Sequence, residues 1–172
     1  MRIAPRRFRE VMSRFATGVT VVAATDPISG APSGLTANAV CSVSLDPPLI
    51  LVCVSRRGYT HEIIHRAGYF SINVLAEKQL DASAVFAAGG CPDKFASVPH
   101  RAGSTGTPLL RDSLAWLECG LWATYPGGDH TIFVGQVLYA GGNGDGKRPL
   151  VFYEGSYASL ASGAPQSVAA ST

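Results

Sequence analysis

The chain has 172 residues, of which 47% are hydrophobic and only 15% are charged, and its formal net charge is +2. This length favours one domain with a sizeable core, and so small a net charge gives no reason to expect a nucleic-acid partner. No apolar run is long enough to span a bilayer, and residues 1–15 lack the apolar core and cleavage site of a signal peptide, so we expect a cytoplasmic protein. The low charge also indicates that a partner subunit buries part of the surface.

The first half of the chain alternates short strands with short helices. The residue pattern predicts, in order, a helix at 5–17, strands at 19–25, 34–45 and 49–55, a helix at 59–68, a strand at 69–75 and a helix at 76–90. The turn before the strand at 49–55 contains Pro47 and Pro48. Residues 91–112 are rich in Gly, Pro, Ser and Thr and are predicted to form a long loop, a type of segment that is often functional.

The second half is dominated by strands. Long strands are predicted at 113–125 and 130–141 around a turn at 126–129, followed by a last strand at 150–157. Residues 158–172 have no periodicity, so we expect one domain at 1–157 and a flexible tail at 158–172. Because most strands are joined by turns rather than by crossover helices, the chain is predicted to be mainly β, an antiparallel barrel with a few helices.

Motifs for metal and for dinucleotide binding are missing from the sequence. The four cysteines form no CxxC pair, and His61 and His65 have no indicated third ligand, so no metal site is predicted. No GxGxxG follows a predicted strand, which disfavours a Rossmann site. The cysteines inside apolar strand patterns are expected to be buried thiols, and these are Cys41, Cys53 and Cys119.

Polar side chains alternate with apolar ones along the strand at 34–45. On a regular strand one face would carry Thr36, Asn38, Ser42 and Ser44. A row of short donors suits the edge of a flat ring such as isoalloxazine, and small neighbouring residues would let the ring approach the backbone. A half-exposed strand with its hydroxyls in water gives the same pattern, and the pattern alone favours that second interpretation.

The junction between the strand at 49–55 and the helix at 59–68 has the chemistry of a phosphate site. Ser55, Thr60 and the first amides of the helix could hold a phosphate, with Arg56 or Arg57 supplying the charge. A capped helix with solvated arginines explains the same residues equally well.

Two more candidates lie farther along the chain. Lys94 could close over a phosphate and Phe95 could cover a ring, although a loop lysine is more often only solvated. His130 opens a strand at a tight turn, where a neutral imidazole could contact a ligand or a reduced nicotinamide, or could be structural. Nothing indicates a catalytic serine, cysteine or carboxylate pair, so a cofactor is expected to carry the chemistry of any enzyme built on this chain.

Several stretches together match one known family, in the right order. They are RFATGVTVV (14–22), GLTANAVCSVSLDPPLILV (34–52), INVLA (72–76), DKF (93–95), GTPLL (106–110), LAWLEC (114–119) and GDHTIFVGQV (128–137). Over roughly residues 8–157 the chain resembles the flavin reductase-like family, which includes the small reductase components of two-component flavin-dependent monooxygenases.

The resemblance implies a fold, an activity and an assembly. The fold is a split β-barrel of Greek-key type that binds FMN or FAD, in a homodimer with each flavin near the subunit interface. The activity is that of an NAD(P)H:flavin oxidoreductase, which uses NADH or NADPH and passes reduced flavin to a separate monooxygenase. A non-enzymatic flavin-binding or electron-carrier protein on the same barrel stays open as an alternative.

The resemblance also implies which residues meet the cofactors. The positions that match flavin-binding residues of the family are Thr36, Ala37, Asn38, Ala39, Ser42, Val43, Ser44, Ser55, Thr60, Lys94, Phe95 and Tyr153. The segment after Ser55 varies in the family, and Arg56 is assigned to the phosphate by its place there. His130 matches the family's histidine near the docked nicotinamide, and it is the one catalytic candidate. Ala39 and Val40 stand where many members carry Ser and Phe, so one side-chain contact to flavin is expected to be missing.

Overall fold

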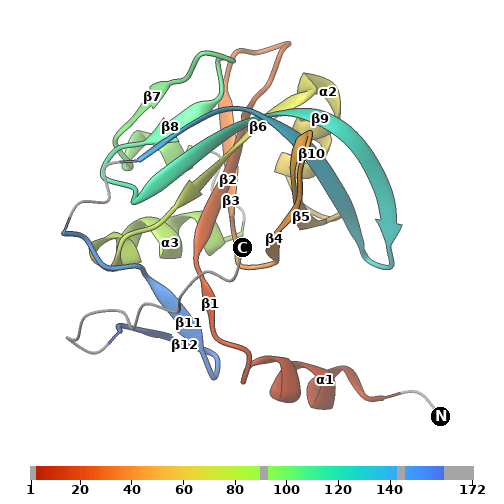
Figure 1. Cartoon of the computed structure of the whole chain (residues 1–172), viewed down its shortest axis with the longest axis vertical. Helices are drawn as coiled ribbons and strands as arrows, with labels where there is room; N and C mark the ends of the chain where they lie inside the picture. Colours follow the sequence, from red (N-terminus) through yellow and green to blue (C-terminus); the bar gives the residue numbers. More distant parts are fainter. Residues whose placement is uncertain (1–2, 90–92, 143–145, 161–172) are drawn as a thin grey trace.

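The centre of the molecule is a strongly curved antiparallel sheet (Figure 1). The structure is a computed structural model and describes residues 3–89, 93–142 and 146–160. Seven strands form the sheet in the order β3-β2-β6-β9-β10-β5-β4. Their bounds are β2 Thr20–Thr25, β3 Pro32–Ala37, β4 Val40–Leu45, β5 Pro48–Ser55, β6 Tyr69–Val74, β9 Ala115–Gly127 and β10 His130–Gly142.

The two edge strands of this sheet, β3 and β4, are consecutive in the chain, so the chain crosses from one edge to the other at Asn38 and Ala39. The crossing is held from both sides. Thr20 Oγ1 on β2 donates to Ala37 O at 2.7 Å, and Cys53 N on β5 donates to Ala39 O at 3.0 Å. The predicted mainly β, antiparallel fold is therefore confirmed, but the barrel is not closed: the chain crosses from β3 to β4 without a ladder between these two edge strands.

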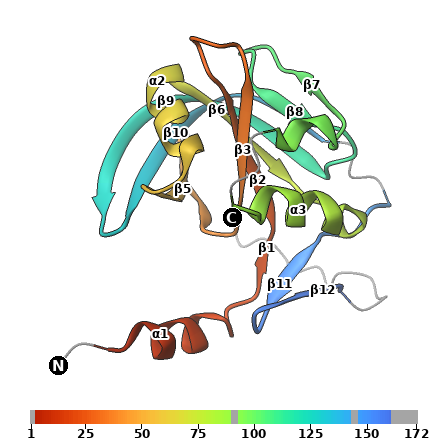
Figure 2. The same cartoon turned by 180° about the vertical axis from the view of Figure 1, so that it is seen from behind.

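Two hydrophobic clusters hold helices against the sheet, and Figure 2 shows α2 and α3 lying against it. The first contains Ile63 and Ile64 of α2 (Tyr59–Ala67), which pack on buried residues of β2, β5, β6 and β10. The second contains Phe86 of α3 (Leu80–Ala87) and Phe95 of the short helix η2 (Lys94–Ala96). A further short helix, η1 (Glu77–Gln79), precedes α3. The helices are thus fixed by burial of apolar side chains on both sides of β2.

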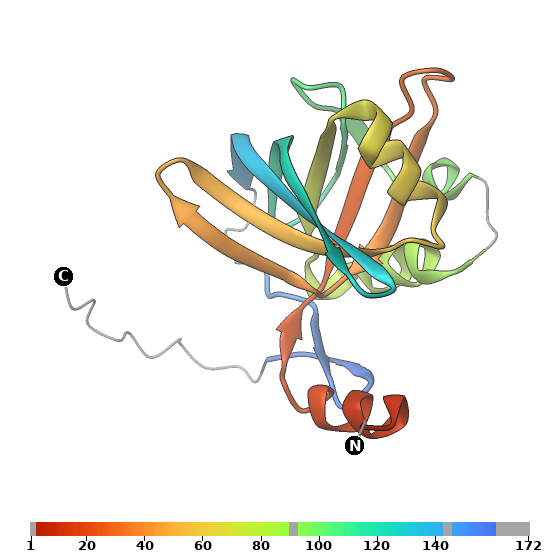
Figure 3. The same cartoon turned by 90° about the vertical axis from the view of Figure 1, so that its right-hand side faces the viewer.

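A small sheet and the first helix project from this body (Figure 3). The small sheet contains β1 (Thr17–Gly18), β11 (Val151–Tyr153) and β12 (Ser156–Ala158). The helix α1 (Pro5–Met12) has no buried residue, and its end is held where Glu154 N donates to Ser13 O at 2.8 Å. A separate hairpin of β7 (His100–Ala102) and β8 (Pro108–Leu110) packs against the body.

The structure corrects several predicted boundaries. The helix predicted at 5–17 ends at Met12, and the strand predicted at 34–45 is two strands separated by the crossing. The helix at 76–90 is divided into η1 and α3, the loop at 91–112 contains η2, β7 and β8, and the strand at 150–157 turns back at Glu154 and Gly155, where φ is positive. Residues 161–172 lie outside the described part, so the division into a domain at 1–157 and a tail at 158–172 stays a prediction.

The cysteines differ in exposure. Cys119 is buried as predicted, Cys53 is half-buried, and Cys41 is exposed. The prediction for Cys41 was wrong because β4 is an edge strand that pairs only with β5. Within the described ranges, no helix is both long and apolar enough to cross a membrane.

Candidate functional site

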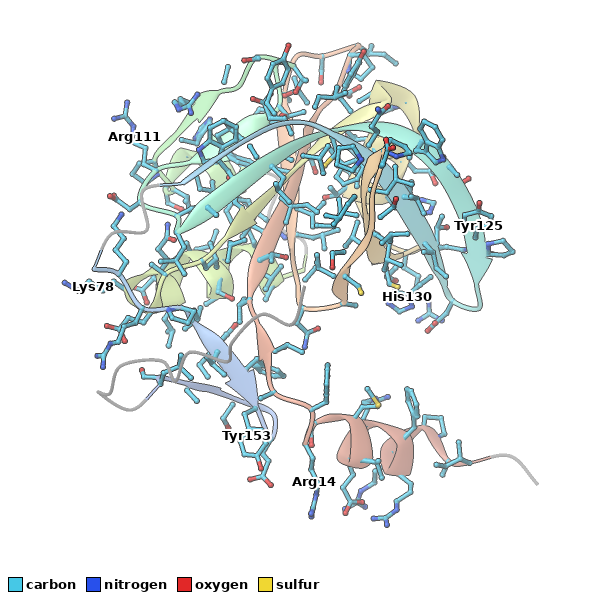
Figure 4. The ribbon with its side chains drawn as sticks, viewed as in Figure 1. Arg14, Lys78, Arg111, Tyr125, His130 and Tyr153 are labelled. Atoms are coloured by element: carbon cyan, nitrogen blue, oxygen red, sulfur yellow. The ribbon has the colours of Figure 1, made fainter. Side chains whose placement is uncertain are left out.

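The ends of β5 and β10 lie side by side at one rim of the sheet. Ser55 and His130 are opposed Cα partners there, and Arg56 N donates to Asp129 O at 3.1 Å. The His130 side chain is 42% exposed, and its Nδ1 lies 2.8 Å from Asp129 Oδ1 (Figure 4). This hydrogen bond lowers the pKa of the Asp129 carboxyl. The rim therefore presents an imidazole whose orientation is set by a neighbouring carboxylate.

The N-terminus of α2 begins beside the same rim. Its N-cap residue is Gly58, no side chain caps the helix, and Gly58 N donates to Ser55 O at 3.2 Å. The N–H groups of Tyr59 and Thr60 find no acceptor among the described residues. Such free amides at a helix start attract anions. The expected hydroxyl of Thr60 is less available, because Thr60 is buried and its Oγ1 lies 2.8 Å from Ser33 Oγ.

The crossing between β3 and β4 supplies backbone donors. Asn38 and Ala39 are both exposed, and in the described part of the chain neither of their N–H groups donates a hydrogen bond. Ala37 is buried beneath them. A polar ring edge with alternating donors and acceptors can use such unpaired amides and the Asn38 side chain. The donors at the crossing therefore fit the edge of an isoalloxazine ring. Ala39 has no side-chain hydroxyl, but its backbone N–H and that of Asn38 are still present as donors.

The predicted polar row does not exist as one continuous face. Thr36 Oγ1 donates to Ser83 O on α3 at 2.7 Å, which directs it toward the helix. Ser42 is exposed and Ser44 is half-buried, and the β4–β5 register shifts between them, at Val43. An irregularity of this kind interrupts the alternation of side chains. Only part of the predicted row can therefore face one ligand.

Lys94 and Phe95 are placed differently from the expectation. Lys94 Nζ donates to Phe86 O at the end of α3 at 2.9 Å. Phe95 is buried and packs edge-on against Phe86 and His100, with both ring centroids 4.8 Å away. In this structure Phe95 thus supports α3 and does not offer a face to a ligand, and Lys94 would have to leave Phe86 to reach a phosphate.

Tyr153 lies apart from the other candidates. It is the last residue of β11 in the small sheet, and Figure 4 labels it near Arg14, below the body that carries His130. A single chain therefore gathers the β5–β10 rim, the start of α2 and the crossing, but it does not bring Tyr153 to them.

The sequence analysis missed a hydrogen bond that ties α2 to the rim. His61 is buried, and its Nε2 lies 2.8 Å from Oγ1 of the buried Thr131, the residue after His130. His61 also stacks edge-on with His65 and Phe133, which gives both histidines a structural environment. No group of three metal-ligating side chains occurs among the residues that the structure describes. The only feature of the sequence that could have pointed to this hydrogen bond is that Thr131 directly follows the candidate residue His130.

Comparison with known proteins places these features in a family. The protein-family model described as flavin reductase like domain matches residues 12–161 of this chain. The reductase subunit HsaB of a flavin-dependent monooxygenase from Rhodococcus jostii (strain RHA1) is 39% identical over 158 residues, which are 92% of this chain and 79% of that protein.

Two further similarities involve a longer protein and a solved structure. A protein of Rhizobium meliloti (strain 1021) described as a probable flavin reductase is 47% identical over 133 residues; this is 77% of the chain but only 42% of that protein. The NADH:FAD oxidoreductase of Streptomyces globisporus, solved with NAD and FAD fragments, superposes with a TM-score of 0.87 at 35% identity and covers 96% of this chain and 99% of that one. The predicted resemblance is confirmed, and the chain belongs to the flavin reductase-like family.

Proposed function

We propose that this chain is an NAD(P)H:flavin oxidoreductase that transfers hydride from NADH or NADPH to FMN or FAD. The observation that carries the proposal is the pairing of Ser55 with His130, which puts a candidate phosphate site and a candidate nicotinamide contact on one rim. Membership of the flavin reductase-like family and the NAD and FAD fragments bound by the S. globisporus relative support it. A bound flavin would supply the hydride acceptor, which no side chain can provide.

The residues of this chain would bind and orient the reactants. Ser55, Arg56 and the free amides at the start of α2 would hold the flavin phosphate. The amides of Asn38 and Ala39 would hydrogen-bond the polar edge of the ring and stabilise negative charge that develops there on reduction. His130, oriented by Asp129, would help to place the nicotinamide.

The reduced flavin is proposed to serve a separate monooxygenase in the cytoplasm. The R. jostii relative is a reductase subunit of a flavin-dependent monooxygenase, which supports this partner class. An exposed rim whose amides find no acceptor among the described residues suits a cofactor that has to dissociate.

The assembly is proposed to be a homodimer. The helix α1 and the turn after it expose an apolar stripe that no other described residue covers, formed by Phe8, Val11, Met12 and Phe15. Burial of such a stripe against a second copy would be favourable, at about 25 cal/mol per Å². The double variant Phe8→Glu/Met12→Glu should be monomeric in light scattering, whereas Ile28→Glu, which alters a still more exposed turn residue, should not change the mass. A dimer that survives the double variant would refute this role of α1.

The activity is tested by NADH and NADPH oxidation in air, with and without added FMN or FAD. The proposal expects consumption that depends on flavin, and a preferred pair identifies both cofactors. A protein that binds flavin in equilibrium dialysis but consumes neither NADH nor NADPH would refute the reductase activity and would support the electron-carrier alternative.

A further inference from the structure

A second site lies on another side of the molecule. A cavity of about 680 Å³ opens beside η1 and the start of α3, and its wall continues into residues 97–99, 111–112 and 146–148. Figure 4 labels Lys78 and Arg111 from this wall on the opposite side of the molecule from His130. The volume lies in the range typical of pockets for small molecules.

The floor of this cavity is apolar. Ala82 and Val85 of α3 face it together with Val98, which is buried, and Pro99. Ala82 and Val85 also pack against the hydrophobic cluster beneath α3, so the floor is part of the folded core. A ligand with an apolar body would remove this surface from water on binding, which is favourable.

The rim of the cavity is charged and has an excess of positive groups. Four cationic residues and three acidic residues line it. Two of the cations are engaged, because Arg148 Nε lies 3.0 Å from Glu77 Oε2 and Lys147 Nζ lies 3.4 Å from Asp112 Oδ1.

The remaining two cations are available. The side chains of Lys78 and Arg111 make no hydrogen bond or ion pair with any residue in the described ranges. A negative group at either of them would meet an ammonium or a guanidinium, and the guanidinium can bind a carboxylate in a bidentate manner. A polyphosphate is a poorer match, because the other cations are already neutralised and Asp81 also faces the cavity.

We propose that this cavity binds a small organic acid, with its apolar body on the floor formed by α3 and its carboxylate or sulfonate at Lys78 or Arg111. The site differs from the candidate flavin site. Other residues of α3, Ser83 and Phe86, accept hydrogen bonds from Thr36 and Lys94 at 2.7 and 2.9 Å. The helix therefore separates the two sites, and flavin and the acid should bind together.

The test uses 8-anilinonaphthalene-1-sulfonate, an aromatic sulfonate whose fluorescence rises in apolar surroundings, titrated into the full chain saturated with FMN or FAD. The double variant Lys78→Gln/Arg111→Gln removes whichever cation meets the sulfonate and should weaken its binding about fivefold, the size expected for one exposed charge contact. The matched control Arg9→Gln/Arg14→Gln removes two exposed charges from the α1 region and should leave binding unchanged. Equal binding by both double variants would overturn the proposal.

A second pair of variants tests the cavity itself. Val85→Trp should fill the floor and abolish the fluorescence change, and Ala82→Leu is a milder substitution if the first does not fold. Unchanged binding in a folded variant of either kind, checked by circular dichroism, would refute the site. Displacement of the sulfonate by flavin would also refute it, because the probe would then occupy the flavin site. These readouts need no turnover, so they do not depend on the proposed reductase activity.

Discussion

His61 Nε2 lies 2.8 Å from Thr131 Oγ1. This buried hydrogen bond joins the first turn of α2 to β10, one residue beyond His130. The neighbouring residue Thr60 is joined in the same way to Ser33 on β3, at 2.8 Å. The start of α2 is therefore fixed to two strands that are far apart in the sheet order. This arrangement sets the spacing between the free amides of α2 and the His130 rim.

Thr131→Val should disturb that spacing, because it leaves the buried His61 nitrogen without its partner. We expect a loss of about 1–3 kcal/mol in unfolding free energy, and a rise in KM for FMN that exceeds the rise for riboflavin, which lacks the phosphate. Thr131→Ser keeps the hydroxyl and should restore both properties. Equal changes in KM for FMN and riboflavin would contradict a role in positioning the phosphate site and would leave His61 a purely structural residue.

His130→Ala should lower kcat/KM for the nicotinamide by about tenfold while leaving the dissociation constant of flavin nearly unchanged. The reason is that His130 lies at the exposed rim, whereas the amides assigned to flavin belong to α2 and the crossing. Asp129→Asn keeps the imidazole and weakens only its orientation, so a smaller loss is expected. Steady-state kinetics and equilibrium dialysis measure the two effects, and a normal kcat/KM in His130→Ala would remove this residue from the site.

Local patterns were sufficient to predict much of the fold. The helix α2 was predicted within one residue because its apolar face is regular and Gly68, with φ of 68°, ends it in the left-handed conformation. The strands β5, β6, β9 and β10 were also predicted closely, since each is bounded by turn residues. These signals are carried by neighbours in the chain and need no knowledge of tertiary contacts.

The crossing at Asn38 and Ala39 could not be predicted in the same way. Polar and apolar residues alternate through Asn38 and Ala39 and the pattern is interrupted only at Val40, which does not by itself mark a change of sheet edge. The strand is divided there because β3 pairs with β2 whereas β4 pairs with β5, and these two pairs lie at opposite edges of the sheet. Phe95 is a similar case, because its burial depends on Phe86 and on the hairpin that carries His100.

Asn38→Asp should weaken flavin binding, because it adds a negative charge beside amides that are proposed to meet an electron-rich ring edge. We expect a loss of about tenfold in affinity, with a smaller loss for Asn38→Ala, which removes the side-chain amide without adding charge. Flavin fluorescence quenching measures both. If the two variants lose the same affinity, charge at the crossing is unimportant; if neither loses any, Asn38 does not contact flavin.

Glu118 is a buried carboxylate that holds the turn between β7 and β8. It accepts hydrogen bonds from Thr105 N at 2.7 Å, Thr105 Oγ1 at 2.6 Å and Ser104 N at 3.0 Å. Burial alone would raise the pKa of Glu118, but these donors and the charge of Arg101 outweigh it, so the pKa is lowered from the ordinary value of 4.5. A Cβ at Gly103 would collide with this carboxylate, which explains the glycine there.

Glu118→Gln should therefore destabilise the fold by about 2 kcal/mol at neutral pH, because an NH₂ group replaces one of the two carboxylate oxygens, each of which accepts from an N–H donor. Since the folded pKa is lowered, the stabilisation is fully present above the unfolded value near 4.5 and is lost as the pH falls through the lower folded value. The difference between the wild-type chain and Glu118→Gln should accordingly shrink as the pH falls below about 4.5. Urea unfolding at pH 7 and below pH 4.5 measures this, with the exposed Glu10→Gln as a control that should change little. Parallel losses of stability in both chains would exclude Glu118 as the titrating group.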